Sequence, residues 1–262
     1  MKLHSQLVFA LTLAAALYTA QAQSLAPIHA KCVIGRGEDA GKISLHINED
    51  SDCSADRHCG SNFSNESLNR FTGFTLTDLD REGAQLTAKL SAESGTLTCT
   101  GIVHAQELVG DSLFTPDASF VERMDKLGFR GFDSRKLEAY TFVNVTSDYA
   151  RSLQQAHIQG VNTDNLIAMR IFNVDPAYAQ SFPSMGYEQP DADKLIGLKV
   201  QGVNAEEVKQ IRALGFQPTL DELIQIRIFK ITPEFVHRMQ DRGLKNLTIA
   251  KLVQIRIFKL DE

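Results

Sequence analysis

Five side chains that could bind a metal or transfer a proton gather between positions 46 and 59: His46, Cys53, Asp56, His58 and Cys59. Zinc requires thiolates or neutral imidazoles that converge tetrahedrally, and zinc motifs commonly hold a tight C-x2-C step. Here the two cysteines are six positions apart, which favours a disulfide across the loop CSADRHC. The sequence therefore predicts no metal ligands.

Motifs for other kinds of catalysis are also missing. The chain has no H-E-x-x-H pair and no G-x-S-x-G elbow. The glycine-rich stretch RGEDAG, residues 36–41, lacks the strand and helix that flank a nucleotide-binding loop. We therefore expect no cofactor and no enzymatic activity, with a hydrolase that uses the N-terminal part of the chain as an alternative.

All four cysteines, Cys32, Cys53, Cys59 and Cys99, lie in the first 100 residues. In an exported protein, an even number of cysteines in one segment predicts disulfides, here two. The evidence for export is the N-terminal segment described next. Three pairings are possible. A local Cys53–Cys59 bridge together with Cys32–Cys99 is one of them, and the sequence leaves the choice open.

The first 22 residues have the features of a cleaved signal peptide. Lys2 supplies a positive start, residues 7–17 are apolar, and Ala-Gln-Ala at 20–22 matches the small-x-small cleavage pattern. The apolar run is shorter than the about 20 residues of a membrane span, and no later stretch is long and apolar enough. We expect cleavage near Ala22, no transmembrane segment in the mature chain, and a periplasmic or extracellular location.

The mature chain is acidic. The full sequence has 27 Lys and Arg against 32 Asp and Glu, and Lys2 is the only charged residue before position 23, so the mature net charge is 26 − 32 = −6. Nucleic-acid binding needs a basic face. We therefore expect no nucleic-acid partner.

The second part of the chain, residues 114–262, repeats one unit five times, with repeats that start near positions 117, 146, 175, 204 and 232. The aligned positions are 29, 29, 29 and 28 residues apart, and they are Phe120, Tyr149, Tyr178, Glu207 and Phe235. A period of this length is typical of stacked repeat proteins. It predicts an α-solenoid of five αα-hairpins.

Each unit is expected to hold two short capped helices. The first helices open on side chains that can accept hydrogen bonds from the first turn: Asp117, Thr146, Asp175, Asn204 and Thr232. The second helices bury a leucine column: Leu137, Leu166, Leu195, Leu223 and Leu252. Helices of about ten residues are marginal alone in water, so contacts between neighbouring units must stabilise them.

Residues 23–113 are expected to form a small antiparallel β domain that contains the disulfides. Residues 42–48, 85–92 and 96–105 are rich in Thr, Val, Leu and Ile, and the first of them alternates apolar and polar side chains. Glu-Ser-Gly at 93–95 predicts a hairpin turn. The predicted fold class is therefore α+β, with the β domain followed by the solenoid.

One repeat position near the end of the second helix is basic in four of five copies. This basic column consists of Thr141, Arg170, Lys199, Arg227 and Arg256. One interpretation is that the charges complement helix C-termini and pair with acidic residues of a neighbour. The other is that they form a strip that binds an anionic partner. Both stay open at this point.

The strings TPEFVHRM, RALGF, DELIQIRIF and KLVQIRIF resemble short helical repeats of exported or membrane-linked bacterial proteins. Similar repeats form the tails of antirepressor-type, membrane-embedded zinc peptidases. The resemblance covers about residues 95–262. This chain lacks the peptidase part, and it has Phe229 and Phe258 where the repeat commonly has His. The resemblance therefore implies export and a repeat fold, but no peptidase activity and no functional residues.

These features together predict an exported bacterial interaction or scaffold protein. Its repeat surface would bind a protein, a peptide or an anionic component of the cell envelope, and a protein or peptide partner is expected. A sensor-like accessory regulator of cell-envelope stress is the alternative.

Overall fold

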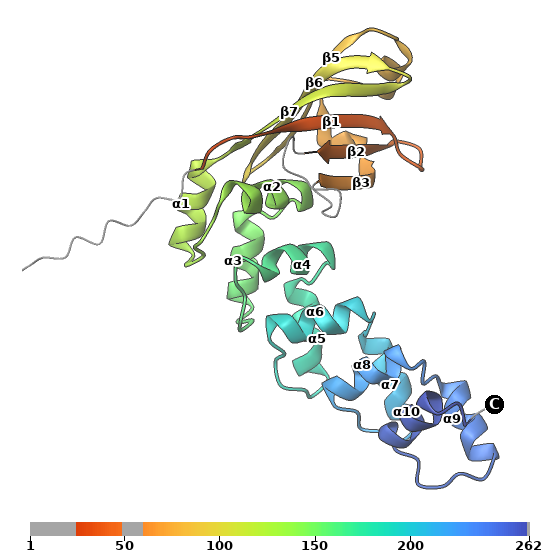
Figure 1. The fold of residues 1–262 in the computed structure, drawn as a ribbon. Helices are drawn as coiled ribbons and strands as arrows, with labels where there is room; N and C mark the ends of the chain where they lie inside the picture. The colour runs from red at the N-terminus through yellow and green to blue at the C-terminus, as the bar shows by residue number, and fades with distance from the viewer. Residues whose placement is uncertain (1–24, 49–59, 261–262) are drawn as a thin grey trace, which may run out of the picture.

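The computed structural model describes residues 25–48 and 60–260. The expected signal peptide, with its cleavage position Ala22, and the expected Cys53–Cys59 pair lie outside these residues. Within them, the protein belongs to the α+β class, as predicted: a seven-stranded antiparallel sheet precedes ten α-helices (Figure 1). The change from strand to helix falls between Pro116 and Ala118, close to the expected boundary at 113–114.

The sheet has the spatial order β3-β2-β1-β7-β6-β5-β4. The strands are β1 (Ile28–Arg36), β2 (Lys42–Asn48), β3 (Gly60–Ser67), β4 (Phe71–Thr72), β5 (Gln85–Ala92), β6 (Gly95–His104) and β7 (Glu107–Pro116). The 3-10 helices Leu68–Arg70 and Leu76–Asp80 connect β3 to β4 and β4 to β5. The hairpin turn predicted at 93–95 joins β5 to β6, and it occupies residues 93 and 94, because Gly95 already pairs with Ala92.

Period-two patterns decide which face of each strand is buried. In β2, Ile43, Leu45 and Ile47 are almost fully buried, while the residues between them are partly exposed. The same alternation recurs in β6. The sheet thus has one packed face, and the alternating apolar side chains in the sequence identify it.

A disulfide joins Cys32 of β1 to Cys99 of β6, with a Cα–Cα distance of 6.0 Å. Strand β7 lies between these two strands, and its Gly110 is opposite Cys32. A Cβ atom at Gly110 would lie 2.1 Å from the carbonyl oxygen of Thr100, so only glycine permits this close approach. The bond belongs to one of the three pairings that the sequence left open, and its two ends are 67 residues apart.

The helices come in pairs along the chain. The first members are α1 (Ala118–Lys126), α3 (Ser147–Gln155), α5 (Pro176–Ser184), α7 (Ala205–Ala213) and α9 (Pro233–Asp241). The second members are α2 (Ser134–Val143), α4 (Asn165–Ile171), α6 (Ala192–Val200), α8 (Leu220–Ile228) and α10 (Ile249–Ile257). We call residues 118–257 the helical array.

The predicted caps of the first helices are all formed. The side chains of Asp117, Thr146, Asp175, Asn204 and Thr232 each accept a hydrogen bond from a backbone N–H of the first turn. Each cap satisfies a donor that the helix itself cannot pair. His157 follows α3 at a position where other repeats have glycine, and it takes the left-handed conformation at φ 56°.

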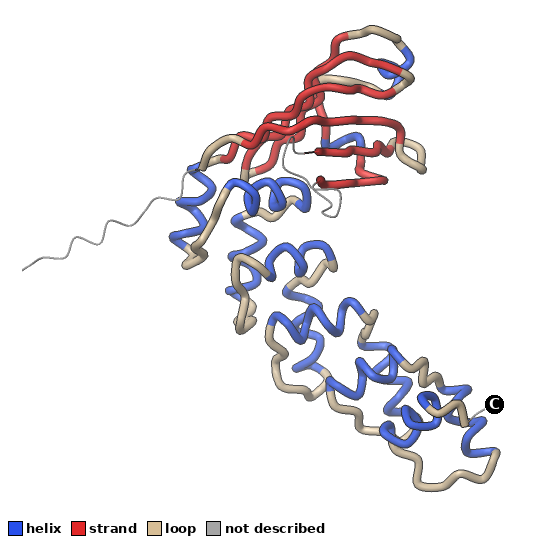
Figure 2. Tube along the Cα trace, in the orientation of Figure 1, coloured by secondary structure: helices blue, strands red, loops and turns tan. Residues whose placement is uncertain are grey.

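Neighbouring second helices contact one another in the order α2, α4, α6, α8, α10. The leucine column is buried between them, with Leu137, Leu166, Leu195, Leu223 and Leu252 at most 1% exposed. The array leads away from the sheet, and Figure 2 shows the strands at one end of the molecule, with the two short 3-10 helices beside them and the α-helices extending from that end.

The sheet meets the array at α2, which contacts β5, β6 and β7. The rings of Phe63 in β3 and Phe142 in α2 stack with their centres 4.3 Å apart. Arg70 donates hydrogen bonds to the carbonyl oxygens of Thr141 and Phe142, at the end of α2. The hydroxyl groups of Ser94 and Thr141 are 2.8 Å apart. The first repeat is thus covered by the sheet.

Candidate functional site

The basic column lies at the contacts between neighbouring repeats. Arg170 donates to the carbonyl oxygen of Asn144 over 3.1 Å, at the end of the preceding second helix. Arg227 donates to Gln201 over 2.7 Å, and Arg256 donates to Lys230 over 3.3 Å. Carbonyl groups at a helix C-terminus carry partial negative charge and lack intrahelical partners. These contacts are the ones described by the first interpretation of the column, in which the charges complement helix C-termini.

Aromatic rings lie beneath most of these cations. The guanidinium of Arg170 is 5.3 Å from the ring centre of Tyr149. The ammonium of Lys199 is 4.2 Å from that of Tyr178, and the guanidinium of Arg256 is 3.9 Å from that of Phe235. All these distances are within the range of a cation–π interaction. The aligned positions Phe120, Tyr149, Tyr178, Glu207 and Phe235 therefore form a ring column with one exception, in the fourth repeat.

The two tyrosines of the ring column also connect their helix to the residue just before the cap of the next repeat. The hydroxyl of Tyr149 donates to the carbonyl oxygen of Val174 over 2.6 Å, and that of Tyr178 donates to Val203 over 2.9 Å. Burial raises the pKa of both phenols, which keeps them protonated as donors. A ring, a cation and a carbonyl oxygen thus recur as one arrangement.

Glu207 breaks this arrangement in the fourth repeat. Its Oε1 pairs with Arg227 over 3.3 Å, and its side chain is 17% exposed. Its Oε2 is buried and accepts no hydrogen bond from any described residue. Burial raises the pKa of Glu207, and the charge of Arg227 opposes that shift. Beside it lies a cavity of about 380 Å³.

A second column, which sequence inspection missed, follows the basic column by one residue. Ile171, Val200, Ile228 and Ile257 are 53%, 46%, 52% and 52% exposed. We call them the aliphatic column. Their counterpart in the first repeat, Phe142, is only 5% exposed because Phe63 covers it. Scattered exposed apolar residues are common, but four at one repeat position form a regular surface.

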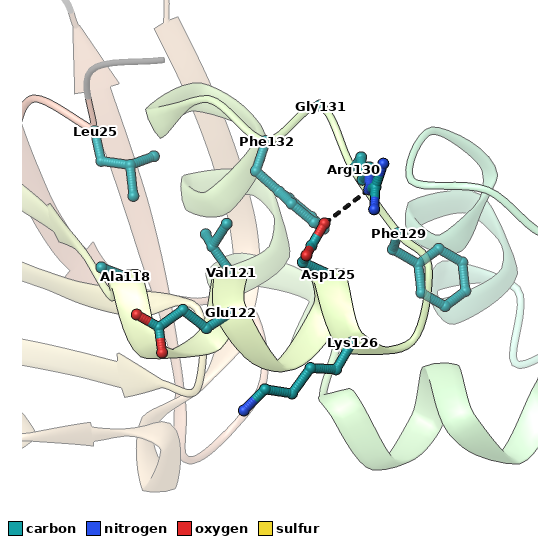
Figure 3. A pocket seen from close by; sticks show the side chains of 10 residues that line it. All are labelled: Leu25, Ala118, Val121, Glu122, Asp125, Lys126, Phe129, Arg130, Gly131 and Phe132. Atoms are coloured by element: carbon teal, nitrogen blue, oxygen red, sulfur yellow. Dashed lines mark hydrogen bonds and ion pairs between the residues drawn. The ribbon is translucent and has the colours of Figure 1, made fainter. Parts of the chain in front are cut away.

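A groove of about 650 Å³ lies beside α1 (Figure 3). Val121, Phe129, Phe132 and Leu25 give it apolar walls. Charged groups surround them, and Asp125 pairs with Arg130 over 2.8 Å. Figure 3 shows these side chains around the groove without a nucleophile and base in contact.

The cluster considered for metal binding falls largely outside the described residues, because Cys53, Asp56, His58 and Cys59 all lie in the segment 49–59. His46 lies in β2. Elsewhere in the described chain, no three His, Cys, Asp or Glu side chains are grouped so that they could hold a metal ion. The basic column likewise does not converge on one point, since each member occupies its own contact between repeats.

No family model, no curated protein and no solved structure matches this chain. None of the helices in the described part has the length and apolar character needed to cross a membrane. The fold and the columns of the helical array are therefore the basis for assigning a role.

Glu207 and the aliphatic column are the two features that residue types alone did not single out. Both are visible when the repeats are aligned, since Glu207 is the one acidic residue at an otherwise aromatic position. The aliphatic column looks like a core position in sequence, because Ile and Val are usually buried. Only the packing of the second helices shows that it faces outward.

Proposed function

We propose that the protein is an exported bacterial scaffold that binds a protein or peptide partner along its helical array. In this proposal the array is an α-solenoid of five repeats, and its binding surface is the outer side of the second helices. The regular spacing of the caps, the contacts between successive second helices and the repeated cation–ring pairs support the solenoid. Solenoids present extended surfaces suited to elongated partners.

The observation that carries the proposal is the aliphatic column. Four half-exposed side chains recur at one repeat position. In the first repeat, the same position is already covered by a contact within the protein. There, Phe142 packs against Phe63 of the edge strand β3. The same surface, left open in the other repeats, can bind apolar side chains of another polypeptide in the same way.

The contacts of the basic column favour a polypeptide over a polyanion. Its arginines already hydrogen-bond to helix-end carbonyl groups, and three of its four cations stack on rings. A strip that neutralises an anionic polymer would need charges directed to solvent. Binding of the anionic envelope component therefore becomes an outcome of the test rather than the expectation.

A periplasmic or extracellular location is part of the proposal. The Cys32–Cys99 disulfide supports it, because such bonds persist in oxidising compartments. The resemblance of the repeats to those of exported bacterial proteins points the same way.

Site-specific photo-crosslinking in the producing cell tests the proposal. A photoreactive amino acid replaces Val200, Ile228 or Ile257 in turn, and the matched control replaces Lys209, an exposed residue of a first helix. We expect one and the same polypeptide to be crosslinked from the three column positions and not from position 209. Crosslinks to no polypeptide, or an identical pattern from the control, would contradict the proposal.

A further inference from the structure

The contact between the fourth and fifth repeats lacks the ring that the neighbouring contacts have. In the second and third repeats, Tyr149 and Tyr178 lie under a cation and donate to the carbonyl oxygen of the residue just before the cap of the following repeat. In the fifth repeat, Phe235 lies under Arg256. The fourth repeat keeps the cation, Arg227, but has Glu207 at the ring position.

The cavity beside Glu207 is lined by the groups that would surround such a ring. Its lining includes Glu207, Gln210, Ile211, Arg227, Ile231 and Pro233. We call this cavity the recess. Ile231 is the counterpart of Val174 and Val203, whose carbonyl oxygens accept from the tyrosines of the second and third repeats. At about 380 Å³ the recess has room for one aromatic side chain.

The buried carboxylate oxygen defines which side chain the recess would take. Oε2 of Glu207 has no hydrogen-bond donor among the described residues, and leaving a buried acceptor without a donor is unfavourable. A phenol supplies both missing parts, because its ring stacks under a guanidinium and its hydroxyl donates a hydrogen bond. A phenylalanine or leucine side chain would leave Oε2 unsatisfied, and a phosphotyrosine would bring negative charge against Glu207.

We propose that the recess is a subsite that receives a tyrosine side chain of the partner polypeptide, with Arg227 over the ring and Glu207 accepting from the hydroxyl. This inference rests on the proposed function, since it names a residue of the same partner. The recess adjoins the aliphatic column in sequence, because Ile228 follows Arg227 in α8. The second and third repeats supply the internal template for the ring under a cation, whereas the acceptor of the hydroxyl is specific to the fourth repeat.

The test is an NMR titration of the ¹⁵N-labelled full protein with N-acetyl-tyrosinamide as the probe. We expect saturable shifts, in the millimolar range, at the backbone amides of residues 207–211 and 226–232. N-acetyl-phenylalaninamide should bind about fivefold more weakly, because it lacks the hydroxyl. No saturable shifts at these amides, or equal affinity for the two probes, would overturn the inference.

Two variants sharpen this result. Glu207→Tyr restores the ring found in the second and third repeats, so the protein should fold and the shifts should be lost because its own ring fills the recess. Glu206→Tyr, an exposed neighbour in the same turn, is the matched control and should bind as the wild type does. Retained binding in Glu207→Tyr would overturn the inference.

If Glu207→Tyr does not fold, the variant Arg227→Gln provides a second test of the subsite. It removes the stacked cation, and the affinity for N-acetyl-tyrosinamide should fall about threefold; unchanged affinity would overturn the inference. The probes are too small to depend on the aliphatic column. A negative titration therefore leaves the crosslinking test intact, and a negative crosslinking test leaves the titration intact.

Discussion

The sheet and the helical array are held together over very different distances along the chain. In the sheet, β1 pairs with β7, so that Ile34 lies opposite Leu108, and the disulfide links residues 67 positions apart. In the array, the side-chain hydrogen bonds that connect repeats reach about one repeat along the chain, for example 26 residues from Arg170 to Asn144 and 31 from Tyr187 to Pro218. The sheet should therefore unfold as one unit, whereas the stability of the array should be a sum over contacts between neighbours.

Where the two regions meet, the sheet nevertheless contacts the array through the same interaction that connects repeats, an arginine that donates to carbonyl oxygens at a helix end. Arg70 donates to carbonyl oxygens at the end of α2, as Arg170 does from the other side. Thr141 replaces the cation of the basic column in the first repeat, because it faces Ser94 of the sheet and not a preceding helix end. The sheet thus takes the place of a preceding repeat and covers the beginning of the array.

The largest expected difference between the regions concerns the disulfide. Replacing both Cys32 and Cys99 by Ala should lower the stability of the sheet by about 4 kcal/mol, because the bond closes a loop of 67 residues in the unfolded chain. Helices α5–α10 should keep their stability. Amide exchange measured separately for strands and helices checks this, and an equal loss in α5–α10 would contradict it.

Within the array, the leucine column should dominate. Leu223 is 1% exposed, and Leu223→Ala should cost about 3 kcal/mol, a usual value for a fully buried leucine. Ile228→Ala, on the same helix but 52% exposed, is the control and should change stability by less than about 0.5 kcal/mol. Denaturant midpoints decide, and similar costs for the two variants would mean that something covers Ile228.

The contacts of the basic column should each contribute less. Arg227→Gln and Arg256→Gln should each cost about 1 kcal/mol, because each loses a charge-assisted hydrogen bond to a helix-end carbonyl. Lys209→Gln, at an exposed position, should cost almost nothing. Thermal unfolding of the single and double variants checks both the size and the additivity expected for separate contacts. Two arginine variants as stable as the wild type would show that the column stabilises nothing.

The smallest effect is a pH dependence at Glu207. Burial raises its pKa in the folded protein above the ordinary value of 4.5. As pH rises above that value, the unfolded chain ionises first, so the wild type loses stability until pH passes the folded pKa. Glu207→Gln lacks this loss, so its free energy of unfolding should rise relative to that of the wild type as pH increases above the ordinary value of 4.5, whereas exposed Glu206→Gln should show no such rise. A stability difference between Glu207→Gln and the wild type that does not change with pH would contradict the raised pKa of Glu207.

Regular patterns made a large part of this fold predictable. The caps Thr146 and Asp175 were identifiable because a cap needs only a side-chain oxygen at one position. Strand β2 was identifiable from its alternation. The order of the strands was not predictable, because register and neighbours depend on contacts far apart in sequence, and the short strand β4 has no pattern of its own.

The candidate site was predictable only in part. The recurrence of Arg170 and Arg227 marked the right repeat position, but their hydrogen bonds depend on where the preceding helix ends. The recess depends on the absence of a ring at Glu207, which has meaning only against the rings of the other repeats. Such features arise from the stacking of repeats, which no single repeat sequence contains.

Native-state hydrogen exchange at increasing denaturant tests the central comparison most directly. The account predicts that amides of β1, β6 and β7 converge on one common opening free energy. It also predicts that amides of α9 and α10 open at lower free energies than those of α3–α6, because the contact before them has Glu207 instead of a ring. A single opening free energy shared by all protected amides of the sheet and the array would contradict the account.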